Sequence, residues 1–480
     1  MTKINIQQMM AESGVAFGTS GARGLVSQMT DRVCAAYSLA FLHGLGLAKP
    51  GQKIAVGMDL RPSSPTIVRA CAAGIRQAGC EVDFCGVLPT PALALYALKR
   101  GIPAIMVTGS HIPFDRNGIK FYRAEGEISK ADEAAMTQAE VELQAINNDA
   151  LLPNVNPTAL QQYRERYTGL FAADLLAGWR IGIYEHSSAA RDCLRDVFSA
   201  LGADVVGLAR TDTFVPIDTE AVSEEDRKRG QTWAAEHHLD AIISTDGDGD
   251  RPLIADETGN WLRGDIVGLL CAHFLGADTV VTPVSCNTAI EASGLFRQVV
   301  RTRIGSPYVI VGMEQMLAAG SASVVGFEAN GGFLVGNDLT IGGQTLAALP
   351  TRDAVLPALA VLAMARQQGG KVSTLLDGLP QRYTASDRLQ DFPVADSRAL
   401  LDSLQNDDTA YQNLWGNELG AVVRRDLTDG LRLTFDNGEV VHLRPSGNAP
   451  ELRCYAEADS MERAGALVTL TLRRIAGVTL

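Results

Sequence analysis

The sequence predicts an α/β protein: three similar α/β domains with mostly parallel mixed sheets, and a smaller C-terminal α+β domain, arranged around a central cleft. Short apolar strands alternate with helical patterns in three successive rounds, which is typical of parallel sheets. The pattern then changes to a hairpin and a long closing helix. A chain of 480 residues, 46% of them hydrophobic, is long enough for several domains. The expected domains are residues 1–155, 156–259, 260–378 and 379–480.

The first round is a βαβαβ unit that leads to a serine. After its first strand, Ser63 and Ser64 precede Pro65, which is typical of a helix N-cap followed by proline in the first turn. Gly79 ends that helix, and a second helix and a third strand carry the chain directly to Ser110. We expect strands over 53–59, 80–87 and 102–108, with helices over 65–78 and 91–100.

The same order of elements occurs twice more. The second round ends in a loop with three aspartates, and the third ends in the loop 328–332, Glu-Ala-Asn-Gly-Gly. Similar phrases at 77–82 and 200–205 support an internal repeat. Because ligands bind beyond the carboxyl ends of parallel strands, we expect the three loops to line one cleft. The expected strands are 180–184, 203–208, 239–245, 279–284, 298–304 and 322–327, with helices that include 223–238 and 289–296.

From about Tyr383 the pattern indicates a small α+β domain. Asp436-Asn437-Gly438 between two apolar runs is a hairpin signal. A polar loop over 444–450 follows, and a strand and a helix rich in Arg and Leu close the chain. We expect a helix near 396–404 and strands over 431–435, 439–443 and 451–456.

Composition and charge exclude several classes of partner. The formal net charge is −13 and Lys and Arg are scattered, so we expect no nucleic-acid partner. The eight cysteines lie mostly in apolar stretches without CxxC pairs, which favours reduced thiols in a cytoplasmic protein. Residues 1–11 lack the apolar core of a signal peptide, and no apolar stretch approaches the roughly 20 residues that span a bilayer, so we expect no membrane partner. A monomer or homodimer is expected.

Ser110 and three aspartates offer the groups of a phosphoryl-transfer site. A serine can carry a phosphoryl group if a cation shields its charge and holds it in line with an acceptor hydroxyl. Asp246, Asp248 and Asp250 alternate with glycines, so the backbone can turn tightly and direct three hard oxygen ligands at one Mg²⁺. A phosphate oxygen on Ser110 would complete the metal site.

Neighbouring residues extend this hypothesis. His111 adds a polar group beside the serine, and Lys120, ten residues beyond Ser110, is expected to be a mobile cation for proton transfer or charge stabilisation. Arg251 is expected to anchor the Ser110 loop or the substrate. Each residue alone has an ordinary interpretation, such as a capped turn or a surface cation, and only their combination favours a catalytic site.

The aspartate loop has two other interpretations. Residues 246–257 match a calcium loop at positions 1, 3, 5 and 12, but Arg251 stands where the turn needs glycine, and the flanks resemble strands rather than helices. A haloacid-dehalogenase-type phosphatase would use Asp246 as nucleophile and Asp248 as acid. That hypothesis leaves Ser110 and the C-terminal loop without roles.

The C-terminal loop is typical of a phosphate-binding loop. Arg444 can donate two hydrogen bonds to phosphate oxygens, and Ser446, Asn448 and the backbone near Gly447 supply neutral donors. Arg453 could assist from the next strand. An ordinary Pro/Gly hairpin loop is the alternative.

Two glycine-containing loops offer further contacts. Glu328 and Asn330 could accept hydrogen bonds from sugar hydroxyls and donate to them, although a plain turn would look the same. Residues 17–24 form a glycine-rich loop with one arginine, Arg23, which is weak evidence by itself.

Taken in order, FGTSGARG, TGSHIPFDRNGIKFY, DGDGDR, GFEANGG and RPSGNAPELRCY resemble the motifs of the α-D-phosphohexomutase family. The resemblance covers essentially the whole chain and is closest to the bacterial phosphomannomutase branch. It implies that Ser110 is phosphorylated, that the three aspartates hold Mg²⁺, that the third loop selects the sugar and that the last loop binds the substrate phosphate. Four more residues fall on family positions that help catalysis or bind the phosphoserine region: Arg23, His111, Lys120 and Arg251.

The implied activity is a reversible exchange between mannose 6-phosphate and mannose 1-phosphate through a hexose 1,6-bisphosphate. Phosphoglucomutase, phosphoglucosamine mutase and a non-catalytic sugar-phosphate-binding relative are the alternatives. Three departures bear on the sugar: Gly109 and Ile112 replace the usual Ala and Asn of the serine motif, the loop 328–332 replaces Glu-x-Ser-Gly-His, and Ser306 replaces a residue that is often polar or basic.

Overall fold

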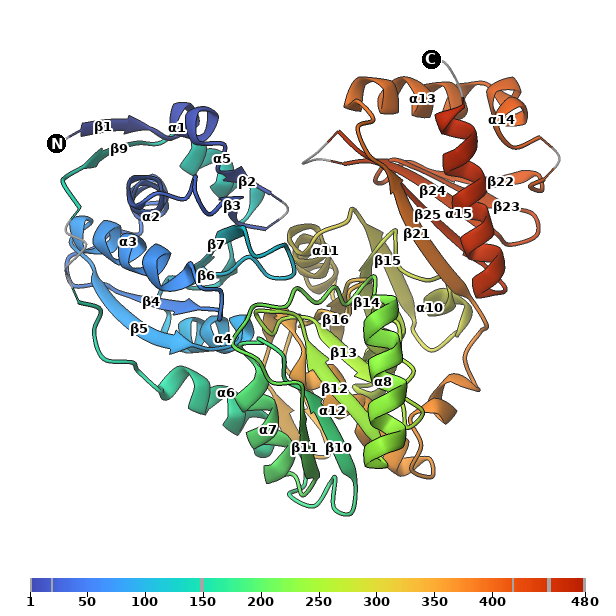
Figure 1. Cartoon of the computed structure of the whole chain (residues 1–480), viewed down its shortest axis with the longest axis horizontal. Coiled ribbons are helices and arrows are strands. Elements are labelled where there is room, and N and C mark those ends of the chain that lie inside the picture. The colour runs from blue at the N-terminus through green and yellow to red at the C-terminus, as the bar shows by residue number, and fades with distance from the viewer. Residues whose placement is uncertain (1, 19, 147–150, 417, 447–449, 478–480) are drawn as a thin grey trace.

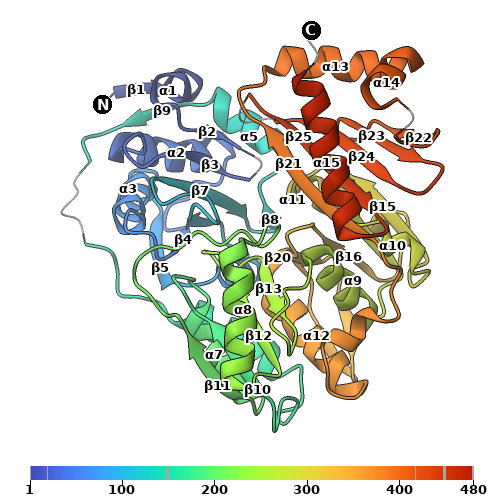
Figure 2. The same ribbon diagram turned by 45° about the vertical axis from the view of Figure 1, so that its right-hand side comes forward.

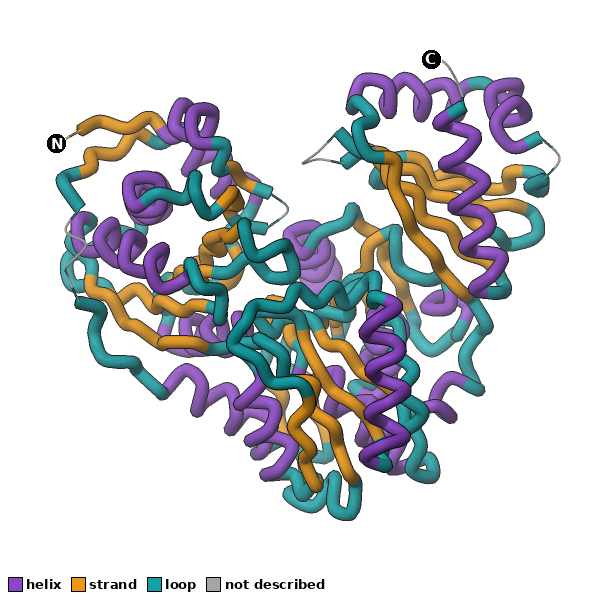
Figure 3. Tube along the Cα trace, in the orientation of Figure 1, coloured by secondary structure: helices purple, strands orange, loops and turns teal. Residues whose placement is uncertain are grey.

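The computed structural model describes residues 2–18, 20–146, 151–416, 418–446 and 450–477 of the chain (Figure 1). Three α/β domains follow one another, and a C-terminal domain lies at the opposite end of the molecule from the N-terminal strands (Figures 1 and 3). The predicted fold class is confirmed. Among the described helices, none is long and apolar enough to cross a bilayer.

The first domain contains a mixed sheet with the strand order β2-β3-β7-β6-β4-β5, and β8 pairs with β7. Strands β5, β4 and β6 are mutually parallel, and β7 returns antiparallel to β6. A small ribbon, β1 with β9, lies apart from this sheet. The strands are β1 (Thr2–Asn5), β2 (Ala16–Phe17), β3 (Ala22–Leu25), β4 (Lys53–Met58), β5 (Glu81–Val87), β6 (Ala104–Val107), β7 (Arg116–Arg123), β8 (Gly126–Glu127) and β9 (Glu140–Leu143), and the helices are α1 (Ile6–Ser13), α2 (Asp31–Gly44), α3 (Ser64–Gln77), α4 (Thr90–Arg100) and α5 (Lys130–Gln138).

The second domain repeats this arrangement with the strand order β11-β10-β12-β13. Its first three strands in the chain are parallel, and β13 returns antiparallel to β12. The elements are α6 (Thr158–Thr168), β10 (Arg180–Tyr184), α7 (Arg191–Ala200), β11 (Asp204–Leu208), α8 (Glu224–His237), β12 (Ala241–Thr245) and β13 (Pro252–Ala255).

The third domain has the order β15-β14-β16-β17-β20, again with an antiparallel strand after the third parallel one. Each repeat therefore ends its third parallel strand in a loop that leads into an antiparallel strand, as the sequence predicted for the motif loops. The elements are α9 (Gly264–Phe274), β14 (Thr279–Pro283), α10 (Ala289–Ala292), β15 (Gln298–Thr302), α11 (Ser306–Ala318), β16 (Val324–Phe327), β17 (Phe333–Val335), β18 (Leu339–Ile341), β19 (Gln344–Leu346), β20 (Leu349–Asp353), α12 (Val355–Gln367) and the 3₁₀ turn Ser373–Leu376.

The C-terminal domain packs helices against an antiparallel sheet with the order β21-β25-β24-β23-β22. Strands β23 and β24 form the predicted hairpin, and Gly438 adopts a φ of 80° in its turn. The elements are β21 (Tyr383–Leu389), α13 (Val394–Asn406), α14 (Asp408–Trp415), β22 (Val422–Asp426), β23 (Leu431–Phe435), β24 (Val440–Pro445), β25 (Leu452–Ala458) and α15 (Met461–Ala476).

Three local expectations differ from the structure. Ser63 makes no side-chain cap to α3, because its hydroxyl accepts a hydrogen bond from Asn117 Nδ2 instead. The helix expected over 289–296 is only the single turn α10. Strands β21 and β22 were not predicted, since their exposed faces carry charged residues rather than a strict alternation.

Apolar packing forms several core clusters, including one that lies within the first domain alone. One core cluster runs through all three α/β domains and includes Leu93 of α4, Ile183 of β10 and Val280 of β14. The C-terminal domain has its own core around Trp415 and Leu443. Figure 2 shows this domain beside β15 and α10 of the third domain. Because its core is separate, the C-terminal domain is joined to the rest mainly by polar contacts.

Polar contacts at domain boundaries are specific. Helix α6 joins the first two domains, and the hydroxyls of its Tyr163 and Tyr167 donate to the two carboxylate oxygens of Asp353, at the end of β20. At the C-terminal domain, Thr288 donates to Glu457 and Asn287 Nδ2 donates to the carbonyl of Arg382. Between the α/β domains these bonds lie within the shared apolar core, and at the C-terminal domain they cross between two separate cores.

Helices α2 and α3 approach so closely that one glycine is required between them. A Cβ at Gly74 of α3 would lie 2.5 Å from the carbonyl oxygen of Ala35 and 2.9 Å from Cβ of Ser38 in α2. We expect Gly74→Ala to lower the free energy of unfolding by about 1–3 kcal/mol, because the helices must separate. Urea denaturation monitored by circular dichroism measures this change.

The matched control is the same substitution in α15. A Cβ at Gly465 would meet no heavy atom within 4 Å. Gly465→Ala should therefore raise the free energy of unfolding by about 0.5–1 kcal/mol, because alanine loses less backbone entropy in a helix. Equal effects of the two substitutions would contradict the close approach of α2 and α3.

Candidate active site

Ser110 lies in the loop between β6 and β7, and its side chain reaches the second domain. The residue is fully buried, and its φ of 52° is unusual for a residue other than glycine. Its Oγ donates to Oδ2 of Asp246 at 2.5 Å. The two motifs that are 136 residues apart in the chain thus meet directly.

The Ser110 loop is held by a buried arginine that the sequence did not single out. Arg61 donates four hydrogen bonds of 2.6–2.9 Å to backbone carbonyl oxygens of this loop, those of Ser110, Ile112, Pro113 and Arg116. Its guanidinium also lies 3.3 Å from the carboxylate of Asp59 and 3.9 Å from the ring centroid of Phe214. Asp59 in turn accepts from Thr108, just before the serine. The unusual backbone of Ser110 is therefore imposed by its surroundings.

The aspartate loop gathers three buried carboxylates between β12 and β13. Asp246, Asp248 and Asp250 each offer an oxygen, and these oxygens lie within 4.8 Å of one another. Gly247 is needed here, since a Cβ would come 2.8 Å from the carbonyl oxygen of Ser110. Oδ1 of Asp248 and Oδ1 of Asp250 are buried without a hydrogen-bond partner in the described part of the chain. Such unpartnered hard oxygens fit a divalent cation that prefers oxygen ligands.

Lys120 lies against this loop from the first domain. Its Nζ donates to Asp248 at 2.6 Å and to Asp250 at 2.7 Å. Burial opposes the charged form of Lys120, but the two carboxylates outweigh it and raise its pKa. Burial would likewise raise the pKa of Asp248, but Lys120 and the hydroxyl of Thr90 outweigh it and hold that pKa below the usual range. The ammonium group is thus fixed between two carboxylates, whereas the sequence suggested a mobile cation.

A second cation comes from the third domain. Arg352 of β20 places Nε and Nη2 3.0 Å from Oδ2 of Asp250. These cations do not fully compensate the negative charge of the loop. Burial and the charges of Asp248 and Asp250 still raise the pKa of Asp246 well above its usual range. Like charges this close favour a proton on one of them.

His111 and two arginines surround the serine. Arg251 Nη1 donates to Nδ1 of His111 at 2.8 Å. This Nδ1 atom of His111 lies 3.5 Å from Ser110 Oγ. Burial and the charges of Arg251 and Arg23 lower the pKa of His111 to about 2, so its ring is neutral. Burial and the charges of Arg251 and Arg352 also lower the pKa of Arg23 to about 10. Within the described residues no carboxylate forms an ion pair with Arg23, which leaves its charge for an anionic ligand.

The third-domain loop lies on the other side of Arg352. Nη1 of this arginine donates to Oε2 of Glu328 at 3.1 Å, and the carbonyl of Asn330 accepts from Thr219 in the second domain at 2.8 Å. Ser306 is fully buried and donates to Glu127 of the first domain at 3.1 Å. All three α/β domains therefore contribute to one site.

The C-terminal loop is described only in part. Arg444 Nε lies 2.8 Å from Oδ2 of Asp429, which also accepts from the backbone N–H of Ile304 in the third domain. The predicted residues Gly447 and Asn448 lie outside the described residues. Arg453 lies 3.9 Å from Glu451, and Ser446 donates its backbone N–H to the same residue's carbonyl. Where the loop is described, no hydrogen bond links it to Ser110 or the aspartates.

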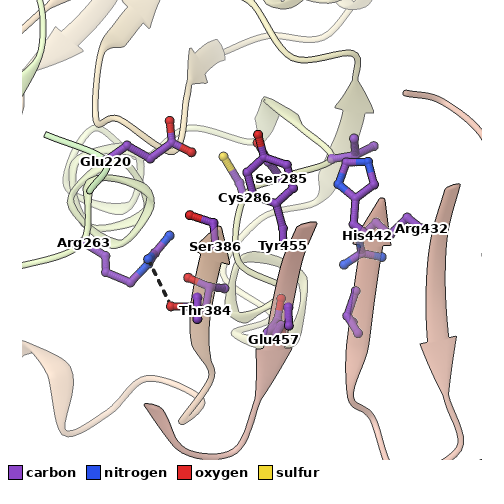
Figure 4. A pocket seen from close by; sticks show the side chains of 14 residues that line it. Glu220, Arg263, Ser285, Cys286, Thr384, Ser386, Arg432, His442, Tyr455 and Glu457 are labelled. Atoms are coloured by element: carbon purple, nitrogen blue, oxygen red, sulfur yellow. Dashed lines mark hydrogen bonds between the residues drawn. The ribbon is translucent and has the colours of Figure 1, made fainter. Parts of the chain in front are cut away.

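A polar pocket lies where the C-terminal domain meets the second and third domains. Figure 4 shows Glu220 and Arg263 on one side and Tyr455 and His442 of the C-terminal strands on the other. Arg263 Nη1 donates to the carbonyl of Thr384 at 3.3 Å. A neighbouring pocket of about 300 Å³ is lined by Asp218, Glu220, Ala221, Ser386, Asp387, Arg388, Arg453 and Tyr455. Arg453 thus lines this second pocket, at the boundary between the second domain and the C-terminal domain.

Comparison with known proteins identifies the family. Models of the phosphoglucomutase/phosphomannomutase domains match residues 14–145 (domain I), 263–383 (domain III) and 392–471 (the C-terminal domain). The chain is 50% identical over 471 residues to the phosphomannomutase of Salmonella muenchen, covering 98% of both chains. It belongs to the phosphohexomutase family. The phosphomannomutase of Sinorhizobium fredii is 46% identical and covers 94% of this chain and 96% of its own.

Solved structures agree on the phosphohexomutase fold. A phosphoglucomutase/phosphomannomutase family protein of Burkholderia thailandensis gives a TM-score of 0.72 at 20% identity, covering 95% of this chain and 96% of its own. At this identity the similarity concerns the fold alone.

Four residues of the phosphohexomutase site were not found from the sequence. Asp59, Arg61, Thr90 and Arg352 are single polar residues without a motif around them. For two of them a signal existed, because Asp59 and Arg61 directly follow β4 at the carboxyl end of a parallel strand. Thr90 and Arg352 reach the site only through packing between domains.

Removing Arg61 tests how the serine loop is held. We expect Arg61→Met to leave four carbonyl oxygens without their donor and Asp59 without its ion-pair partner, and to lower the free energy of unfolding by about 3–5 kcal/mol. Amide hydrogens over residues 108–118 should exchange faster with solvent, as hydrogen–deuterium exchange measures. Arg69→Met, at an exposed position of α3, should change stability by less than about 0.5 kcal/mol. Unchanged exchange in the loop of Arg61→Met would rule out this role.

Proposed function

We propose that the protein is a phosphohexomutase that interconverts mannose 6-phosphate and mannose 1-phosphate through a phosphoserine at Ser110 and a hexose 1,6-bisphosphate. The observation that carries the proposal is the contact of Ser110 Oγ with Asp246, inside a ring of aspartates and cations. A serine hydroxyl that donates to a carboxylate beside a cation site has the surroundings of an activated nucleophile.

The exchange has two balanced steps. In the first, the bond between phosphorus and Ser110 Oγ breaks while a bond forms to the oxygen of the free sugar hydroxyl, and the proton of that hydroxyl passes to Ser110 Oγ. In the second, the bond between phosphorus and the other sugar oxygen breaks while a bond forms to Ser110 Oγ, and the serine proton passes to that sugar oxygen. His111, whose Nδ1 accepts from Arg251 and lies 3.5 Å from Ser110 Oγ, is proposed to keep Arg251 beside the serine.

Asp246, Asp248 and Asp250, with a phosphoserine oxygen on Ser110, would hold Mg²⁺. The ion, when bound, supplies Lewis-acid stabilisation of charge on the transferring phosphoryl group. Lys120 and Arg352 keep the aspartates in place, and Arg23 and Arg251 supply positive charge beside the serine.

Substrate binding is assigned to the loops around this centre. Glu328 and Asn330 are proposed to bind sugar hydroxyls, because they lie beside the aspartate loop through Arg352. Arg444, Ser446, Gly447 and Asn448, with Arg453, are proposed to bind the phosphate that is not being transferred. The mannose preference rests on the two phosphomannomutases that are 46–50% identical over nearly the whole chain. Phosphoglucomutase or phosphoglucosamine mutase activity is the alternative on the same site.

Ser110→Ala tests the phosphoserine. We expect mutase turnover to fall by at least about 1,000-fold with the fold intact, because the phosphoryl carrier is lost. Intact-mass measurement after incubation with hexose 1,6-bisphosphate should show one phosphoryl group on the wild type and none on the variant. Ser199→Ala, an exposed serine of α7, is the control and should keep both properties. Mutase activity in Ser110→Ala would exclude the mechanism. Separate assays of the wild type with mannose, glucose and glucosamine 1-phosphates rank its preference for the three sugars.

Asp248→Asn tests the metal site. We expect Mg²⁺ binding, measured by titration calorimetry on the unphosphorylated protein, to weaken ten- to a hundredfold or more, since a hard charged ligand is lost. Asp204→Asn, in an exposed ion pair on β11, should leave the affinity unchanged. Wild-type activity that survives a strong chelator, or unchanged Mg²⁺ affinity in Asp248→Asn, would remove the metal from the proposal.

A further inference from the structure

Three arginines lie side by side on the polar face of the C-terminal sheet. Arg444 of β24 is paired with Arg453 of β25, and Arg453 is paired with Arg388 of β21. Residues directly opposite each other in antiparallel strands project from the same face of a sheet. The three guanidinium groups therefore share one face, and the core residues Leu443 and Cys454 lie on the other. Like charges in such positions are destabilising, so the row requires neighbouring anions.

The carboxylate nearest to Arg388 and Arg453 neutralises them in part. Nε of Arg388 lies 3.6 Å from Oε1 of Glu451, and Nη2 of Arg453 lies 3.9 Å from Oε2 of the same residue. Both separations are longer than a hydrogen bond. Among the described residues the Arg388 guanidinium makes no hydrogen bond, and Nε of Arg453 is buried without a partner. The two side chains are 49% and 39% exposed, so their N–H groups are accessible to an anionic ligand.

These two arginines line a pocket between the C-terminal domain and the second domain. Its volume is about 300 Å³, and Asp218 and Glu220 form part of the opposite wall. Figure 4 shows Glu220 and Tyr455 on opposite sides of the adjoining opening. Small-molecule sites begin at about this volume. Cations on one wall and carboxylates on the other fit a ligand that carries both phosphate and hydroxyl groups, since carboxylates accept hydrogen bonds from hydroxyls.

The second-domain wall of this pocket continues to the serine site. Thr219, the residue before Glu220, donates its hydroxyl to the carbonyl oxygen of Asn330 in the third-domain loop at 2.8 Å. Burial raises the pKa of Glu220, and the charge of Arg251 acts on this carboxylate in the opposite direction. The pocket is therefore within electrostatic range of the arginine that contacts His111 beside Ser110.

We propose that Arg388 and Arg453 form a phosphate subsite that retains the hexose 1,6-bisphosphate in the cleft while it turns round. The inference rests on the proposed mutase function and deepens it, because that exchange needs a bisphosphate that presents first one end and then the other to Ser110. Guanidinium groups on neighbouring strands can donate to oxygens of one phosphate group. Glu220, across the pocket, can accept from the sugar hydroxyls.

Arg388→Met tests the affinity of the subsite. On Ser110→Ala protein, which has lost the phosphoryl carrier, we expect the Kd for mannose 1,6-bisphosphate to rise about tenfold, because a charge-assisted hydrogen bond is lost. Arg388→Lys keeps the charge without the planar fork and should give a smaller rise. Arg398→Met, at an exposed position of α13, is the matched control and should leave the Kd unchanged. Titration calorimetry measures the Kd, and thermal unfolding followed by circular dichroism verifies that each variant is folded.

Retention of the intermediate has a second signature during turnover. With Ser110 intact, Arg388→Met should need at least about fivefold more added mannose 1,6-bisphosphate for half-maximal activity, because weaker binding is mostly faster release. Phosphoryl transfer from phosphorylated Ser110 to saturating mannose 1-phosphate, measured in a single turnover, should stay within about twofold of the wild type, since Arg388 does not contact the serine. A role in sheet stability alone would not produce this difference between the two measurements.

The inference is overturned if, in folded Arg388→Met, either the Kd or the requirement for added bisphosphate stays at the wild-type value. It is also overturned if Arg398→Met changes them equally, which would indicate an effect of overall charge. A wild type that acquires no phosphoryl group on Ser110 from the bisphosphate would overturn the proposed function instead, so the two failures are distinguishable.

Discussion

The burial of three aspartates within 4.8 Å of one another is the constraint on which the rest of the structure depends. Charges removed from water are costly unless other charges and hydrogen bonds compensate them. Each α/β domain contributes one cation to this compensation: Lys120 from the first, Arg251 from the second and Arg352 from the third. The domains are therefore held in register by an electrostatic requirement as well as by their shared apolar core.

The repeated topology explains how distant segments meet. All three sheets place their motif loop after the third parallel strand and before an antiparallel one, so the three loops emerge at equivalent edges. The shared core through α4, β10 and β14 then brings these edges together. The C-terminal domain has a separate core and polar attachments. Arg444, which we propose to bind phosphate, meets the third domain through Asp429 rather than through the serine site.

Different residues of the site hold its loops in place and offer groups that a ligand can contact. Arg61 and Asp59 hold the Ser110 loop through backbone carbonyls, and Lys120 and Arg352 hold the aspartates, so these four residues have little freedom to contact a ligand. Arg23 and the unpartnered oxygens of Asp248 and Asp250 have no such bonds among the described residues. This division between supporting and binding residues is what a site needs to transfer a phosphoryl group from a fixed serine to a sugar that must turn around.

The sequence by itself determined the fold class, the three parallel strands of each α/β domain and the residues of the compact motifs, such as Ser110 and the three aspartates. These are local signals, since strand periodicity and a run of alternating aspartates and glycines are readable without knowing the neighbours. It gave no indication of Arg352 or Thr90, and it misjudged Ser63 and the mobility of Lys120. Only the tertiary structure decided these, because their roles come from partners more than 50 residues away, and packing between domains has no sequence periodicity.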